Sequence, residues 1–261
     1  GYSRKTRSPN LYERYSWAIS SMSSAMINQF GDGNGYVGNT TLAPEVAHTF
    51  SMTNTLSDKE NWMVKFTPYY TFVQNFINAT RVGSFAMGGY YNPGPYMFQE
   101  LQFVNHAAKL YGFDLNSKLK LYDDNEIGKF EFLSMVNYNY GKDLDAGDPS
   151  KCNFTSGDNI TQDSFVMNQQ CYALTNARRK GDGLYHIMPL NGRLSLQHQL
   201  HGFSNSIELV IVSSKSLVSV QRAEQTTPAY SLINFRSSYD WKDFRIDFAV
   251  ENLANLLYYP A

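Results

Sequence analysis

Polar and apolar residues alternate along most of this chain, and the alternation is clearest in residues 62–78. The even positions there carry Trp62, Val64, Phe66, Pro68, Tyr70, Phe72 and Phe76, whereas the odd positions include Lys65, Thr67, Thr71 and Asn75. Successive side chains of a β-strand point to opposite faces. This period of two therefore predicts a strand with one apolar, aromatic face and one mixed to polar face.

The same pattern recurs often enough to predict an all-β chain. It is clear in residues 129–140, 190–200, 233–241 and 243–251, and weaker in residues 46–54, 101–121 and 207–213. We predict eight strands, preceded by the end of a ninth near residues 1–15. Many reach ten residues or more, which exceeds the five or six of ordinary strands and matches the roughly 9–11 that cross a bilayer. The length favours a transmembrane barrel over a soluble sandwich.

The connections between the predicted strands alternate between short and long. The short ones are residues 57–60, 123–128, 201–204 and a turn near Lys242, and the long ones are residues 81–97, 142–183 and 216–227. Transmembrane barrels have short periplasmic turns and longer extracellular loops. We therefore expect the long connections, together with residues 17–42, on the outside.

Both ends of the pattern lack a partner strand. The first segment begins in mid-pattern near Gly1, and we expect the last strand to run to Tyr258–Ala261 without a returning neighbour. Eight strands can close a small barrel. An open sheet edge in lipid, however, would leave backbone groups unpaired at a cost of several kcal/mol each. We therefore expect additional strands on both sides.

Composition narrows the class of protein further. Of the 261 residues, 17% are charged and 15% are aromatic, and the formal net charge is -1. Low charge with many aromatic residues argues against disorder, and the near-zero net charge gives no support to nucleic-acid binding. No apolar run approaches 18 residues, so no transmembrane helix is predicted, and no signal peptide opens the chain.

Four short elements, in this order, resemble segments of the TonB-dependent receptor family. Residues 1–15 (GYSRKTRSPNLYERY) resemble the first, and Gly38-Asn39 followed by residues 42–45 (LAPE) resemble a Gly-Asn … Leu-x-Pro-Glu element before a strand. Residues 103–114 carry the Asn and Tyr-Gly of a third element, and residues 251–259 (ENLANLLYY) resemble one on the penultimate barrel strand. Ala254 departs from the aromatic residue usual there.

The resemblance implies a specific architecture and function. Residues 1–261 would be the C-terminal portion of a plugged, antiparallel transmembrane β-barrel of about 22 strands, with the plug domain, the early strands and the last strand absent. The protein would lie in the outer membrane of a Gram-negative bacterium, surrounded by lipid. The missing N-terminal region would contact the TonB–ExbB–ExbD complex. It would take up a scarce nutrient: a ferric siderophore, haem, cobalamin or a metal such as copper.

Two other functions remain open at this point. One is a passive porin-like channel, which an upstream plug domain would exclude. The other is a secreted, soluble β-sandwich that binds a carbohydrate or a protein. No nucleophile motif or catalytic constellation stands out, so the chain is not expected to be an enzyme or to hold a cofactor.

Candidate ligand contacts lie in the first outside loop. Met22 and Met26 are four residues apart and close to Asp32 and Asn34. Thioether sulfur suits Cu(I), and residues 30–39 resemble the copper-receptor branch of the family. The alternative is that both methionines are flexible packing under a loop. The metal, if there is one, is not identified.

The remaining candidates concern cysteine and histidine. Cys152 and Cys171 share one polar stretch, and a loop disulfide in an oxidising compartment is the simplest interpretation. His186 and Met188 could form a copper pair, but Pro189 and the alternation that follows favour the start of a strand.

Overall fold

The structure is a computed structural model, which describes residues 1–16, 32–86, 97–146 and 182–260. Its elements in chain order are β1 (Tyr2–Arg7), α1 (Leu11–Tyr15), β2 (Gly35–Val37), β3 (Glu45–Ser51), β4 (Asn54–Ser57), β5 (Trp62–Ala86), β6 (Met97–Asp124), β7 (Gly128–Asp143), β8 (Asp182–Gly183), β9 (Asn191–Leu200), β10 (Phe203–Val212), β11 (Tyr230–Trp241) and β12 (Phe244–Val250). The prediction of an all-β chain is confirmed, since α1 is the only helix among the described residues.

All of these strands belong to one sheet, whereas a β-sandwich would have two. The order across it is β1-β3-β5-β6-β7-β9-β10-β11-β12, and neighbours along this path are antiparallel. The short strands β2, β4 and β8 pair with β6, β5 and β7, and β2 is parallel to β6. In the described part of the chain, β1 and β12 end this path without pairing with each other.

The strand register sorts the side chains onto two faces, as the alternation predicted. On one face, which we call the apolar face, aromatic residues of five strands stand directly opposite one another in an outer aromatic row: Tyr2, Phe50, Tyr70, Tyr111 and Tyr140. Apolar side chains of this face are exposed from β1 to β12. A soluble monomer rarely exposes so large an apolar surface.

The opposite face, the polar face, carries hydrogen bonds and ion pairs. The Thr49 and Thr71 hydroxyls lie 2.8 Å apart, and Lys118 Nζ lies 2.9 Å from Glu131 Oε1. A polar interior with an apolar exterior is the arrangement of an outer-membrane barrel wall.

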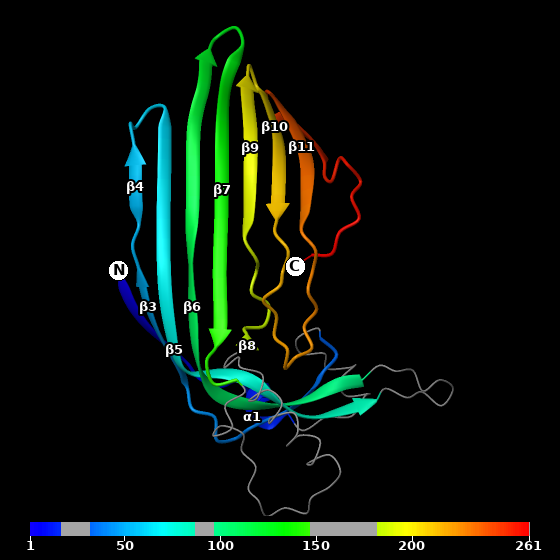
Figure 1. Cartoon of the computed structure of the whole chain (residues 1–261). Coiled ribbons are helices and arrows are strands. Elements are labelled where there is room, and N and C mark those ends of the chain that lie inside the picture. Colours follow the sequence, from blue (N-terminus) through cyan, green and yellow to red (C-terminus); the bar gives the residue numbers. More distant parts are fainter. Residues whose placement is uncertain (17–31, 87–96, 147–181, 261) are drawn as a thin grey trace, which may run out of the picture.

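The short turns gather at one end of the sheet, as predicted. Those between β4 and β5, β6 and β7, β9 and β10, and β11 and β12 lie at the upper end in Figure 1, and α1, β8 and the connection between β10 and β11 lie at the lower end. We call these the turn end and the loop end. Aromatic residues of the apolar face also mark the turn end, where Tyr122 stands opposite Phe130.

The two aromatic levels are one membrane crossing apart. Tyr111 and Tyr122 are 11 residues apart on β6, and Phe130 and Tyr140 are 10 residues apart on β7. A strand rises about 3.3 Å per residue, so a tilt near 40° turns this separation into about 25–28 Å of height. An outer-membrane barrel has an apolar band about 25 Å tall between two aromatic girdles.

A β-bulge in β5 changes the face of the sheet to which the following side chains point. The alternation predicted that Phe76 shares the face of Phe72, but the register shifts between Val73 and Phe76, and Asn75 adopts a positive φ of 53°. Phe76 therefore packs against the buried cluster that contains Val73 and Ala108 on the polar face. Bulges bend a strand, and beyond this point the β5–β6 hairpin runs across the loop end (Figure 1).

Three further boundaries differ from the prediction. Strand β5 continues to Ala86, although the predicted outside loop began at residue 81. The segment of residues 46–54 is divided into β3 and β4 beside Pro68, which has no N–H to donate to the ladder. The last strand ends at Val250 instead of continuing to Tyr258.

The early ending of β12 has a local cause. The backbone N–H of Asn252 donates to the Asn234 side chain at 2.9 Å, and Asn252 and Asn255 both have positive φ angles. The Asn252 side chain then binds the backbone of Leu256 on both its N–H and its carbonyl. These contacts turn the chain away from the sheet.

Candidate functional site

The first and second family-like elements are joined at the loop end by a network of hydrogen bonds. Asn10 and Glu13 form a capping box at the start of α1, with bonds of 2.8 and 2.7 Å. The buried Glu13 carboxylate also accepts from Arg7 at 2.9 Å, and Arg7 makes a two-pronged contact with Glu45 at 2.7 and 2.9 Å. Both carboxylates raise the pKa of the Arg7 guanidinium, which stays charged. The motif residues thus tie β1, α1 and β3 together.

A second hydrogen-bond network accounts for the positions of Asn39 and Asn105, the remaining polar motif residues. The Asn105 side chain accepts from Ala43 N at 2.8 Å and donates to Ala43 O at 3.0 Å, and Asn39 Nδ2 donates to Phe103 O at 3.1 Å. Gly38 is required beside it, because a Cβ there would lie 2.5 Å from the backbone carbonyl oxygen of Arg14. Three of the recognised elements therefore serve to hold the loop-end segments against the sheet.

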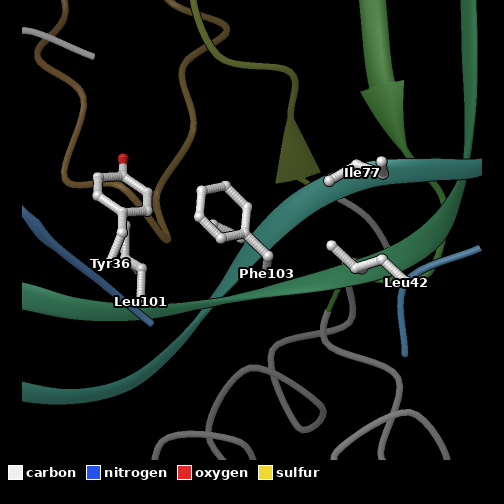
Figure 2. Packing of buried hydrophobic residues seen from close by; sticks show 6 residues of the cluster. Tyr36, Leu42, Ile77, Leu101 and Phe103 are labelled. Atoms are coloured by element: carbon white, nitrogen blue, oxygen red, sulfur yellow. The ribbon is translucent and has the colours of Figure 1, made fainter. Parts of the chain in front are cut away.

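An apolar cluster lies beneath this region (Figure 2). It consists of Tyr36, Leu42, Ile77, Ala79, Leu101 and Phe103, all of them buried. The rings of Tyr36 and Phe103 stack with centroids 5.3 Å apart. The cluster fixes β2 against the bent part of the β5–β6 hairpin, and so fixes Asp32 and Asn34, which come just before β2.

A cavity of about 700 Å³ opens at the loop end. Its lining comes from segments that are far apart in sequence: Asp32, Asn34, Tyr185, His186, Lys215, Arg222, Ala223, Glu224, Gln225, Thr227 and Pro260. Cavities of this volume accommodate small organic molecules. We take this loop-end cavity as the candidate binding site.

Arg222 is a buried cation of the cavity. Its guanidinium lies between two rings, with Cζ 4.9 Å from the centroid of Tyr185 and 5.4 Å from that of Tyr36. It donates to the Tyr36 hydroxyl at 2.9 Å and to Asn78 Oδ1 at 3.4 Å. Burial raises the pKa of Tyr36, and burial and the charge of Asp32 raise the pKa of Tyr185 to about 12. Both hydroxyls therefore remain protonated hydrogen-bond donors at neutral pH.

The connection between β10 and β11 forms one wall through buried charges. Lys215 Nζ donates to Glu224 Oε1 at 2.6 Å, and Glu224 also accepts from the backbone N–H of His186 and Ser219. Asp182 on β8 accepts from Ser219 Oγ at 3.1 Å and from three backbone N–H groups. Burial raises the pKa of Asp182, and the four donors oppose that effect. The carboxylates thus shape the wall of the cavity.

A buried polar chain leads from the cavity into the sheet. Tyr36 donates to Asp32 at 2.5 Å, and Arg222 connects Tyr36 to Asn78. Asn78 donates to Asp143 at 2.6 Å, and the His106 ring lies at the same distance from that carboxylate. A substitution of Arg222 would therefore alter the hydrogen bonds of several buried groups at once.

The predicted contacts Asp32 and Asn34 both line this cavity. Both have a structural role, because Asp32 accepts from Asn34 N and the Asn34 amide donates to Arg222 O at 2.9 Å. Met22, Met26, Cys152 and Cys171 lie outside the described residues, so the methionine contacts and the disulfide remain predictions. Sequence patterns missed Arg222, Lys215 and Glu224, which lie in a loop without periodicity.

His186 lines the cavity next to Tyr185. It stacks on Tyr185 with ring centroids 3.8 Å apart and has a φ of 59°. Across the described ranges, no group of three or more His, Cys, Asp or Glu residues could hold a metal ion. Those ranges also contain no helix that is long and apolar enough to span a membrane.

A second hollow, of about 470 Å³, lies on the polar face of the sheet. It is lined by residues of β9 to β12, among them Gln197, Ser206, Arg236, Arg245 and Asp247. Its position on the wall, closer to the turn end, makes it part of the barrel interior. The loop-end cavity remains the better candidate, because it is larger and residues of several connections line it.

One sheet of long strands, apolar outside and polar inside, defines the wall of a transmembrane β-barrel. A sequence model described as "TonB dependent receptor-like, beta-barrel" matches residues 1–253. The chain belongs to this family. No curated protein sequence matches the chain significantly.

Solved structures with the same fold include receptors and transporters of this type. The "Copper transporter OprC" aligns with a TM-score of 0.64 at 13% identity, over 99% of this chain and 32% of that one. The siderophore receptor PirA from Pseudomonas aeruginosa gives 0.57 at 15% identity, over 98% and 36%. The FrpB iron transporter from Neisseria meningitidis gives 0.57 at 11% identity, over 99% and 32%. This chain thus spans about a third of each, and the likeness at these identities concerns the fold.

Proposed function

We propose that the protein is an outer-membrane receptor that takes up a scarce nutrient by TonB-coupled active transport in a Gram-negative bacterium. The observation that carries this proposal is the exposed apolar face between two aromatic levels, backed by a polar face. Membership of the TonB-dependent receptor-like barrels adds the mode of transport. The solved neighbours are named as transporters and receptors, which supports a function without catalysis.

The loop-end cavity supports an organic chelate as the transported solute. Its volume of about 700 Å³ is far larger than a bare ion requires. Arg222 and Lys215 provide positive charge, and Asp32 and Glu224 provide negative charge. A metal chelate or a macrocycle such as haem or cobalamin offers the carboxylate, hydroxyl and ring surfaces that fit such a lining.

Thr227 offers a direct test of this cavity. Its hydroxyl is buried and has no hydrogen-bond partner among the described residues. A buried polar atom in that state favours a ligand that supplies the missing partner. Thr227→Val removes the hydroxyl at nearly constant shape, so it should weaken solute binding without unfolding the protein.

The transport experiment uses the full-length protein in its own membrane. Cells that express it would be given ferric catecholate and hydroxamate chelates, haem, cobalamin and copper ions, each labelled, with and without TonB. Accumulation of one solute that stops without TonB supports the proposal. Accumulation that continues without TonB would instead identify a passive channel.

Binding to the cavity is then measured with the solute found in that screen. Thr227→Val and Arg222→Met should each raise its dissociation constant roughly tenfold, as expected for one lost buried hydrogen bond or cation contact. Lys242→Met, in the turn between β11 and β12, is the matched control. Unchanged affinity in both cavity variants would place the binding site elsewhere.

A further inference from the structure

The apolar face contains very few charges, and those near the loop end are cations at one level. Among residues that the register places on this face between β1 and the bulge in β5, and on β6 to β12, the charged ones are Arg4, Lys109 and Lys142 and, at the turn end, Asp124. Arg4 stands opposite His48, His48 opposite Phe72, Phe72 opposite Lys109, and Lys109 opposite Lys142. We call Arg4, Lys109 and Lys142, which lie at this level, the cationic row.

Lys109 and Lys142 are direct cross-strand neighbours of like charge. Such a pair destabilises a sheet unless an anion balances it. In the part of the chain that the structure describes, no carboxylate lies within ion-pair distance of Arg4, Lys109 or Lys142. The carboxylates of the neighbouring strands, such as Asp114 and Glu131, are on the polar face. Within the described ranges, these cations therefore have no balancing carboxylate.

The depth of the cationic row indicates what would balance them. Lys109 and Lys142 are two residues beyond Tyr111 and Tyr140 toward the loop end. Two residues of a tilted strand rise about 5 Å. Aromatic girdles lie at the level of the lipid headgroups, so the cationic row lies at the level of the outer-leaflet phosphates. Long lysine side chains can extend along the apolar surface to reach them.

The width of the cationic row adds a constraint. Strands β1 and β6 are separated by three strand spacings, about 14 Å, with β3 and β5 between them. At the β1 side, the Tyr2 hydroxyl lies 2.8 Å from His48 Nδ1, and the two rings stack. The positive groups therefore lie at two ends of a span comparable to a disaccharide headgroup.

We propose that the cationic row binds a phosphorylated glycolipid of the outer leaflet, with one phosphate at the Lys109–Lys142 pair and another near Arg4. This inference rests on the proposed outer-membrane location. The lipid would neutralise the lysine pair and fix the rotation and depth of the barrel wall in the membrane. Lipid A, a disaccharide with two phosphates, has the required chemistry.

The test compares two charge-matched double variants of the full-length protein, purified from outer membranes in mild detergent. Lys109→Gln with Lys142→Gln should reduce the lipid A that copurifies per protein, measured by mass spectrometry, roughly tenfold or more. Lys59→Gln with Lys242→Gln removes the same charge at the turn end and should retain the lipid. Lys109→Arg with Lys142→Arg should also retain it, because the charge remains.

The outcomes separate this inference from the proposed function. Equal lipid A in both Gln double variants, at normal outer-membrane levels, would overturn the inference and leave the transport proposal intact. A wild-type protein that is absent from the outer membrane would overturn both. If the Lys109/Lys142 Gln variant does not assemble, Lys142→Gln alone is measured in its place, and unchanged lipid binding there counts against the inference.

Discussion

The orientation of the wall can be tested by placing one arginine on each face at the same depth. Leu194 and Ser195 are consecutive on β9. Leu194 stands opposite Ser134 on the apolar face, and Ser195 stands opposite Glu208 on the polar face. Ser134 is four residues from Phe130 and six from Tyr140, so Leu194 lies close to mid-membrane.

The expected magnitudes follow from this geometry. An arginine on the lipid face costs about 2–4 kcal/mol at the bilayer midplane and about 0–1 kcal/mol near the interfaces. Leu194→Arg should therefore shift the folded-to-unfolded ratio by roughly a hundredfold. Ser195→Arg should change it little, because the guanidinium meets water and the Glu208 carboxylate. Tyr140→Arg, at the outer aromatic row, should lie between the two.

The assay is reversible unfolding of the full-length protein in lipid vesicles with guanidinium, followed by tryptophan fluorescence. The level of each variant in the outer membrane is a second measurement. Equal destabilisation by Leu194→Arg and Ser195→Arg would refute the assignment of the two faces. Equal destabilisation by Leu194→Arg and Tyr140→Arg would refute the assigned depth.

Three further predictions concern particular positions. Gly112→Ala should lower the outer-membrane level strongly, because its Cβ would lie 1.9 Å from a backbone oxygen of β7, whereas Gly192→Ala, with 3.5 Å to the nearest atom, should be tolerated. Backbone N–H donors, that of Trp62 foremost, lower the pKa of Asp58 from 3.8 to about 2. The turn is therefore fully stabilised above pH 4 and loosens as the pH falls toward 2, which amide exchange would detect. Peptide mapping without reduction should find Cys152 joined to Cys171, and free thiols would refute this.

The motif residues contribute to architecture more than to binding. Arg7, Glu13 and Glu45 join two of the family-like elements, and Asn105 holds a third against Ala43. None of these residues lines the loop-end cavity. The elements that identify the family therefore identify a scaffold, and the residues that would contact a solute come from connections between them.

Alternation along the chain was enough to predict most of the strands, their two faces and the short turns between them. A period of two is a local property, so Trp62 to Phe72 could be assigned to one face without any knowledge of their neighbours. Strand length indicated a membrane-spanning wall in the same local way, because it can be counted from the number of alternating residues.

The reversal of Phe76 and the composition of the cavity depend on contacts between distant segments of the chain. The bulge before Phe76 depends on pairing with β6, which periodicity within one strand does not contain. Arg222 lies between Tyr36 and Tyr185, which are 186 and 37 positions away in the chain. The Lys109–Lys142 pair likewise exists only through the register of β6 with β7. Contacts of this kind arise when distant segments are brought together, and no local pattern in the sequence records them.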